Sequence, residues 1–249
     1  MTKKILILGS RPDAKIVQHD FVYAANAASY YYSDQLTDKK KLIDVVSGDI
    51  LVRPMLEKYK SEKDFYLEKL HRIASSHSEA MALAPGQPRA VHLLRESGYK
   101  NPIIPLNHSR RRNIIGLVSG LTDPIVSDHF LSLEKEQRDI LLNSMLKVNV
   151  RRVKNANAEH NNYFRPSTGV FALCFAIYRH GRNATYTIAG MGLSSRATYP
   201  DMARNLDVER DNTHVFADKK VLEVLASTNY RINTTDPMLK SILPLVERS

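Results

Sequence analysis

The sequence predicts a single α/β domain of the Rossmann type, with a mostly parallel sheet flanked by helices. Three short apolar runs near the N-terminus each end in small polar residues, as parallel strands do when their C-terminal ends carry a site. The middle of the chain has helical spacing of its apolar residues. No internal repeat, low-complexity segment or linker interrupts residues 1–249, so we expect one domain.

The expected strands are short and apolar. The first, Lys3 to Leu8, leads into a turn that begins Gly9-Ser10, and the second, Phe21 to Ala25, ends at Asn26. The third, Leu42 to Val46, ends at a serine and a glycine. Later strands are expected at 101–105, 185–189 and 230–233.

Helices are predicted where apolar residues recur every three or four positions. One begins near Ser61, with Asp64 three places later in the manner of a capping box. The segment 170–178 is apolar on nearly all sides, which predicts a helix buried in the centre of the domain and ended by Gly181. The other expected helices are 89–96, an amphipathic helix at 132–148, and 217–226.

Composition restricts the partners and the compartment. The chain has 36 basic and 26 acidic residues, a net charge of +10, which favours an anionic partner. No apolar run approaches the ~20 residues that span a bilayer, and the apolar stretch after Met1 is too short for a signal peptide. Cys174 is the only cysteine, which excludes an internal disulfide. We therefore expect a cytoplasmic protein.

A candidate anion site lies where a loop enters the buried helix. Arg165 can clamp a carboxylate or phosphate, and Ser167, Thr168 and Gly169 follow it at the helix N-terminus, where backbone N–H groups are unpaired. The alternative is that Ser167 or Thr168 only caps the helix, which is the commoner role of such residues.

The order of elements in the last third resembles sialyltransferases. Residues 165–170 enter the apolar helix, 186–192 follow it, and His214 and Asp218 precede another helix. The resemblance is closest to glycosyltransferase family 42, the bacterial sialyltransferases. The more distant family 29 shares the hydroxyl–glycine helix and the downstream histidine.

The N-terminus extends this resemblance, so that it covers roughly residues 3–26, 165–192 and 214–234. It implies a Rossmann-like fold of the GT-A-like sialyltransferase variant and a CMP-sugar donor. Arg11 stands where the family has a second glycine, and Ala24 where it has an arginine. The donor-binding residues that the resemblance implies are Gly9, Ser10, Asn26, Arg165, Ser167, Thr168, Gly169, Gly190 and Tyr199.

The resemblance also implies a catalytic base, His214, and a mobile lid. Histidine has a pKa near ~6.5, which suits proton abstraction from an acceptor hydroxyl at neutral pH. Without the resemblance, His214 reads as a surface histidine, and Asp218 either orients it or caps the next helix. The stretch 193–213 is polar, with little helical periodicity and no clear strand. In the families it resembles, this stretch is a lid that orders over the bound donor.

Together these features predict an inverting sialyltransferase that needs no cofactor and no metal. CMP leaves through a single phosphate, which hydroxyl and N–H groups can stabilise, and the chain has no Asp-x-Asp motif. The acceptor is expected to be a glycan or glycolipid of a bacterial surface polymer, lipopolysaccharide or capsule. Peripheral contact with the inner face of the membrane and homo-oligomer formation stay open.

Other functions stay open on the sequence alone. A CMP-Kdo, pseudaminic or legionaminic acid transferase is a close alternative, and a retaining version would need a carboxylate nucleophile such as Asp201 or Asp218. A basic nucleic-acid-binding protein is the alternative from another class, although we expect no nucleic-acid partner. It would need its arginine runs, at 110–112 and 151–152, on one face with aromatic residues between them.

Overall fold

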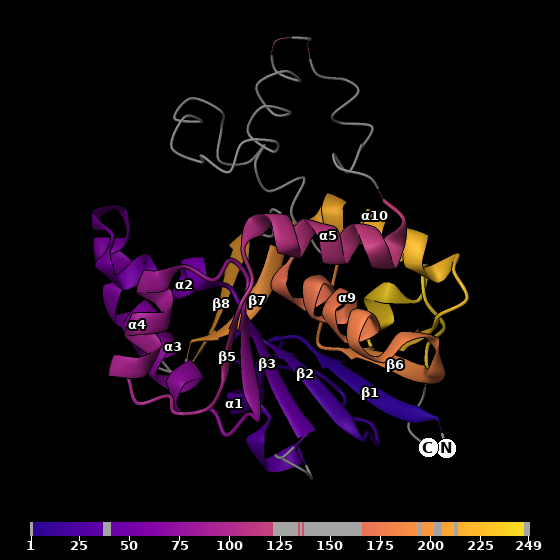
Figure 1. Ribbon diagram of the computed structural model, residues 1–249, viewed down its shortest axis with the longest axis horizontal. Coiled ribbons are helices and arrows are strands. Elements are labelled where there is room, and N and C mark those ends of the chain that lie inside the picture. The colour runs from indigo at the N-terminus through magenta and orange to yellow at the C-terminus, as the bar shows by residue number, and fades with distance from the viewer. Residues whose placement is uncertain are drawn as a thin grey trace.

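The computed structural model confirms the α/β prediction with a seven-stranded, wholly parallel sheet of order β5-β4-β3-β2-β1-β6-β9 (Figure 1). The structure describes residues 2–36, 41–121, 134, 136, 166–193, 196–201, 206–211 and 214–246. The amphipathic helix expected at 132–148 lies outside the described residues, apart from two isolated positions.

The parallel strands follow the sequence-based expectations closely. Their bounds are β1 Lys3–Leu8, β2 Phe21–Ala25, β3 Leu42–Val46, β4 Ala80–Leu83, β5 Ile103–Pro105, β6 Ala184–Ala189 and β9 Arg231–Thr234. Only β4 was not expected. Its four residues, Ala-Met-Ala-Leu, are better helix formers than strand formers, and burial between β3 and β5 overrides that preference.

The helices of the described chain are α1 Ala28–Tyr31, α2 Gly48–Val52, α3 Lys63–Ala74, α4 Pro88–Glu96, α5 His108–Ser119, α9 Thr168–His180 and α10 Val215–Ala226. Single 3-10 turns lie at Ser33–Gln35, Arg53–Met55, Gly181–Asn183 and Pro237–Leu239, and a longer one at Glu57–Glu62. The capping box expected at Ser61 is wrong: Glu62 is the N-cap of α3, and no side chain caps that end.

Two helical layers cover the sheet, one on each face. Alternate residues of β1 point to opposite sides, so that Ile5 and Ile7 pack with α5, α9 and α10, while Leu6 and Leu8 pack with α1. Helix α9 lies along β1, β2 and β3 with α5 next to it (Figure 1). Residues 169–177 of α9 are all buried, which confirms the prediction of a central helix that ends at Gly181.

The expectation that 193–213 contains no strand is wrong. Strands β7 Arg196–Asp201 and β8 Leu206–Asp211 pair antiparallel in a separate two-stranded sheet. Both strands contain aspartate, and β7 contains Pro200, residues that are depleted in strands. The antiparallel pairing of the two segments outweighs those unfavourable propensities.

Among the helices that the structure describes, none has both the length and the apolar character that crossing a bilayer requires.

The strand β3 carries a buried carboxylate. Asp44 has no exposed surface, and neither of its oxygens makes a hydrogen bond of ordinary geometry. Burial raises the pKa of Asp44 to about 6, although the nearby hydroxyls of Ser76, Ser29 and Ser78 favour the charged form. Ionising this group inside the fold therefore costs more than ionising it in the unfolded chain.

We expect Asp44 to make the fold less stable as pH rises from about 4 to about 6. The pKa of Asp44 is higher in the folded state, so its contribution to stability is complete below the unfolded pKa of 3.8 and is lost as pH rises through about 6. At about 1.4 kcal/mol per pKa unit, the loss is on the order of 3 kcal/mol. The free energy of unfolding is measured with urea at pH 4.5 and at pH 7.5. Between these two pH values Asp44→Asn should lose less of this free energy than the unmodified chain does. The same difference in both proteins would contradict the expected cost.

Candidate functional site

The candidate site lies at the point where the strand order reverses. From β1 the chain steps outward through β2, β3 and β4 to β5, then returns to place β6 on the other side of β1. The loops that follow β1 and β6 therefore leave the sheet next to each other at its C-terminal edge. In open α/β sheets, ligands bind in the crevice at such a switch point.

Two glycines, Gly9 and Gly190, make the backbones touch at this edge. The register pairs Leu8 with Ala189, and the N–H of Gly9 donates to the carbonyl of Ala189 at 2.8 Å. A Cβ on Gly9 would collide with the carbonyl oxygen of Gly190. Gly190 has φ +70°, and a Cβ there would come within 2.7 Å of the Ala14 Cβ. The sequence predicted both glycines as site residues, and the structure brings them together.

The side chain of Met191 connects this glycine pair to the N-terminus of α9. A Cβ on Gly9 would come within 2.6 Å of Met191 Cγ, and a Cβ on Gly169 would overlap its sulfur. The side chain of Met191 thus occupies the space that Gly9 and Gly169, which have no side chains, leave open. The segments that begin at Gly9, Ser167 and Gly190 therefore meet at one place, although some 180 residues separate the first from the last. Ser10 and Thr168 belong to the same segments, and Thr168 is half-buried.

Ser167 acts as the N-cap of α9, the alternative that the sequence left open. Its Oγ accepts a hydrogen bond from the N–H of Val170 at 3.3 Å. The N–H of Ser167 itself donates to Asp218 Oδ1 at 2.6 Å. The chain therefore supplies a carboxylate of its own at this helix N-terminus. A ligand anion would meet the remaining N–H groups of the first turn and the hydroxyl of Thr168.

Asp218 is a buried group that positions α9. The residue is 4 % exposed, and burial raises the pKa of its carboxyl group to about 7. The hydrogen bonds from Ser167 and the charge of Arg111 act in the opposite direction and favour the carboxylate. Arg111 is itself buried, where it donates to the carbonyls of Ala84 and Pro166.

Arg111 also bears on the nucleic-acid alternative. Its guanidinium stacks 5.0 Å from the Phe171 ring centroid, whereas the neighbouring Arg110 is exposed. The arginine run at 110–112 is therefore divided between the interior and the surface and does not form a continuous basic face. The second run, at 151–152, lies outside the described residues.

His214 lies at the start of α10, one turn before Asp218. It is the N-cap residue, half-buried, and its carbonyl accepts the N–H of Asp218 at 2.9 Å. Because Asp218 also contacts Ser167, the first turn of α10 lies beside the first turn of α9. The structure thus brings the predicted base to the end of α9 where the predicted anion site lies.

Asn26 lies at the next strand end and has a backbone role. Its φ of +54° is the only positive value among the non-glycine residues that the structure describes. The side-chain Oδ1 accepts the N–H of Ser47 at 3.1 Å, which ties the end of β2 to the end of β3. The amide NH2 is the group with which Asn26 would contact a ligand.

Two of the predicted donor-binding side chains lie outside the part of the chain that the structure describes. Arg165 lies outside the described residues. The backbone of Tyr199 is paired with Val208 in the β7–β8 hairpin, and the position of its side chain is outside the description. Asp201, named as an alternative nucleophile, lies in the same strand.

Sequence reasoning missed Arg11 and Met191 as parts of this site. Arg11 was noted only as a departure from a glycine, yet its N–H donates to the carbonyl of Gly190 at 3.2 Å, and its guanidinium lies against Gly192. The signal that could have found both is their position, because each directly follows a strand-end turn at the switch point.

Comparison with known proteins adds no assignment: no family model, no curated protein and no solved structure matches the chain. Within the described residues, no group of three or more histidine, cysteine or carboxylate side chains is arranged to hold a metal ion.

We expect Gly190→Ala to destabilise the fold more than Gly120→Ala. Both glycines have φ near +70°, which costs an alanine roughly 1–2 kcal/mol, but only Gly190 also faces a neighbour, Ala14. Gly120 has open space around its Cβ position and serves as the matched control. Urea unfolding midpoints measure the difference. Equal losses in the two variants would show that the two backbones at the switch point are not in close contact.

Proposed function

We propose that this chain is a metal-independent glycosyltransferase that moves sialic acid, or a related nonulosonic acid, from a CMP-sugar to a surface glycan or glycolipid. The observation that carries the proposal is the convergence of Gly9, Ser167–Gly169 and Gly190 at the switch point. These are also the segments on which the resemblance to sialyltransferases rests.

The chemistry of the crevice supports an anionic donor. The first turn of α9 offers N–H groups and the Thr168 hydroxyl, and the turn after β1 offers Ser10 and the guanidinium of Arg11. These groups can stabilise the single phosphate through which CMP leaves. The net charge of +10 attracts an anionic donor.

The position of His214 supports an inverting reaction with this residue as general base. A base must come within reach of the acceptor hydroxyl while the donor lies in the crevice. His214 begins the helix whose first turn contacts the N-terminus of α9, and it is half-buried. Asp218 is a poor nucleophile for a retaining reaction because it is 4 % exposed and already accepts the N–H of Ser167.

We expect CMP to raise the melting temperature specifically, and to do so in the presence of EDTA. A ligand that binds only the native state stabilises it by about 2.7 kcal/mol at 100 times its dissociation constant. CDP, UDP, GDP and a short oligonucleotide at matched ionic strength are the comparisons. Stabilisation that requires added manganese or magnesium would contradict the metal-free proposal, and preference for the oligonucleotide would favour the nucleic-acid alternative.

We expect His214→Ala to keep CMP-dependent stabilisation and to lose turnover by roughly 100-fold or more, the contribution of a positioned base. The measurement is release of CMP from a CMP-sialic acid with a panel of oligosaccharide acceptors. His92→Ala is the matched control, since that side chain is 69 % exposed on α4. Full turnover in His214→Ala would move the search for the base to the carboxylates, with Asp201 first.

A further inference from the structure

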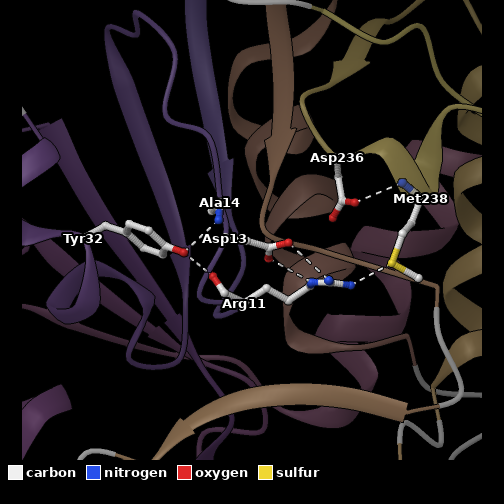
Figure 2. Close-up of polar contacts among 6 residues, drawn as sticks. All are labelled: Arg11, Asp13, Ala14, Tyr32, Asp236 and Met238. Carbon is white, nitrogen blue, oxygen red and sulfur yellow. Dashed lines mark hydrogen bonds and ion pairs between the residues drawn. The ribbon is translucent and has the colours of Figure 1, made fainter. Parts of the chain in front are cut away.

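Arg11 is held by backbone contacts at the switch point. Its N–H donates to the carbonyl of Gly190 at 3.2 Å, and its carbonyl accepts the hydroxyl of Tyr32. The same hydroxyl accepts the N–H of Ala14 at 2.9 Å, so that Tyr32 closes the turn on both sides of Asp13 (Figure 2). The backbone from which the guanidinium extends is therefore held by contacts to both Gly190 and Tyr32.

The guanidinium of Arg11 crosses from the β1 turn to the segment after β9. Its Nη1 donates to the sulfur of Met238 at 2.8 Å (Figure 2). Gly192 makes room for it, because a Cβ at that position would overlap Nη1. The side chain is 23 % exposed, so most of it is covered by the surrounding residues and does not extend into solvent.

The partners of this guanidinium are easily replaced. Nε and Nη2 donate to the two carboxylate oxygens of Asp13 at 3.2 and 3.4 Å, but Asp13 is 68 % exposed and lies on the same turn. An exposed ion pair contributes little, and a thioether is a weak acceptor. The second carboxylate nearby, Asp236, accepts the N–H of Met238 at 3.1 Å (Figure 2). It caps the following 3-10 turn and is 8 % exposed.

We infer that Arg11 binds the anionic group of the ligand. In the absence of ligand, the carboxylate of Asp13 occupies the position of that anion, and the ligand displaces it. This inference rests on the proposed function for the identity of the ligand. A planar guanidinium matches a phosphate or carboxylate with two parallel hydrogen bonds, the geometry that Asp13 now uses. When the ligand arrives, the carboxylate of Asp13 turns out to solvent, and the oxyanion of the donor takes its place against Nε and Nη2. Arg11 thereby selects ligands with an oxyanion at this position.

The direction in which Asp13→Asn changes the affinity for CMP tests the inference. Asp13→Asn removes the competing anion and should tighten CMP binding by about two- to fivefold, the factor that corresponds to an exposed ion pair. Arg11→Gln should weaken it by at least about tenfold, and Arg11→Lys should recover only part of that loss because an ammonium cannot bind in a bidentate manner. Glu57→Gln changes the net charge as Asp13→Asn does, on an exposed ion pair with Lys60, and should leave the affinity unchanged.

Three ligands distinguish whether Arg11 binds the phosphate of the donor or the carboxylate of its sugar. Affinities for cytidine, CMP and CMP-N-acetylneuraminic acid are compared by calorimetry in all four variants. If Arg11→Gln weakens CMP but not cytidine, Arg11 reads the phosphate; if only the CMP-sugar is weakened, it reads the carboxylate of the sugar. Either result supports the inference. The inference would be overturned if Arg11→Gln weakened cytidine binding as much as CMP binding, or weakened the binding of none of the three ligands. Weaker CMP binding in Asp13→Asn would also overturn it, and the Arg11–Asp13 pair would then be structural.

Failure of the proposed function is distinguishable from failure of this inference. If the unmodified chain is not stabilised by CMP, the donor assignment is wrong, and inorganic phosphate becomes the probe. Stabilisation by phosphate that Arg11→Gln abolishes and Asp13→Asn increases still supports an anion site at Arg11. If phosphate does not stabilise the unmodified chain either, the inference is wrong as well.

Discussion

The contact between the backbones of Gly9 and Gly190 is the constraint on which the rest of the site depends. Strands β1 and β6 are neighbours in register up to Leu8 and Ala189, and the next residue of each strand has no side chain to separate the loops. The two loops can diverge only beyond this contact. One runs past Ala14 toward Tyr32, and the other turns Met191 toward α9. The candidate site lies where the two loops separate, immediately after this contact.

The buried helix α9 extends the same constraint into the helical layer. Nine consecutive residues, 169–177, are buried, so the helix cannot rotate or slide without exposing apolar surface. Its N-terminus is fixed by Ser167, which Asp218 holds from α10. A fixed N-terminus is what an anion site needs, because the N–H groups must already point at the ligand before it binds. The rigid core therefore supplies the preorganisation that the proposed anion site would need.

The fold was largely predictable because its signals are local. Apolar runs that end in small polar residues marked β1, β2 and β3 to the residue, and the apolar composition of 170–178 identified the central helix. Strand β4 and the β7–β8 hairpin escaped prediction, since alanine, aspartate and proline carry no strand signal and pairing alone determines those segments.

The site was predictable only in part, because its geometry depends on contacts between distant segments. Ser167 was identified from its position at a helix end, and Gly9 and Gly190 were identified through the resemblance to sialyltransferases. Nothing local indicated that Asp218 would hold Ser167, which precedes it by 51 residues, or that Arg11 would reach Met238, which follows it by 227. In the sequence, Arg11 was a departure from the glycine that the sialyltransferase families have at this position. Only the fold shows that its guanidinium lies between Gly192 and Met238.

The candidate site has two groups that attract an anion, the N-terminus of α9 and the guanidinium of Arg11, and a carboxylate of the chain lies against each of them. The burial of each carboxylate decides whether a ligand can displace it. Asp218, 4 % exposed, meets the N-terminus of α9, and Asp13, 68 % exposed, meets Arg11. To leave Ser167, Asp218 would have to break a 2.6 Å hydrogen bond and leave a buried carboxylate without that donor, which is costly. Asp13 can leave Arg11 by a rotation into solvent, which restores its hydration at little cost. Asp218 therefore joins the first turns of α9 and α10, whereas Asp13 can give up its position to the anion of the proposed ligand. Of the two internal carboxylates, only Asp13 can therefore be exchanged for an external anion, and at α9 a ligand would use the N–H groups that Asp218 leaves unoccupied.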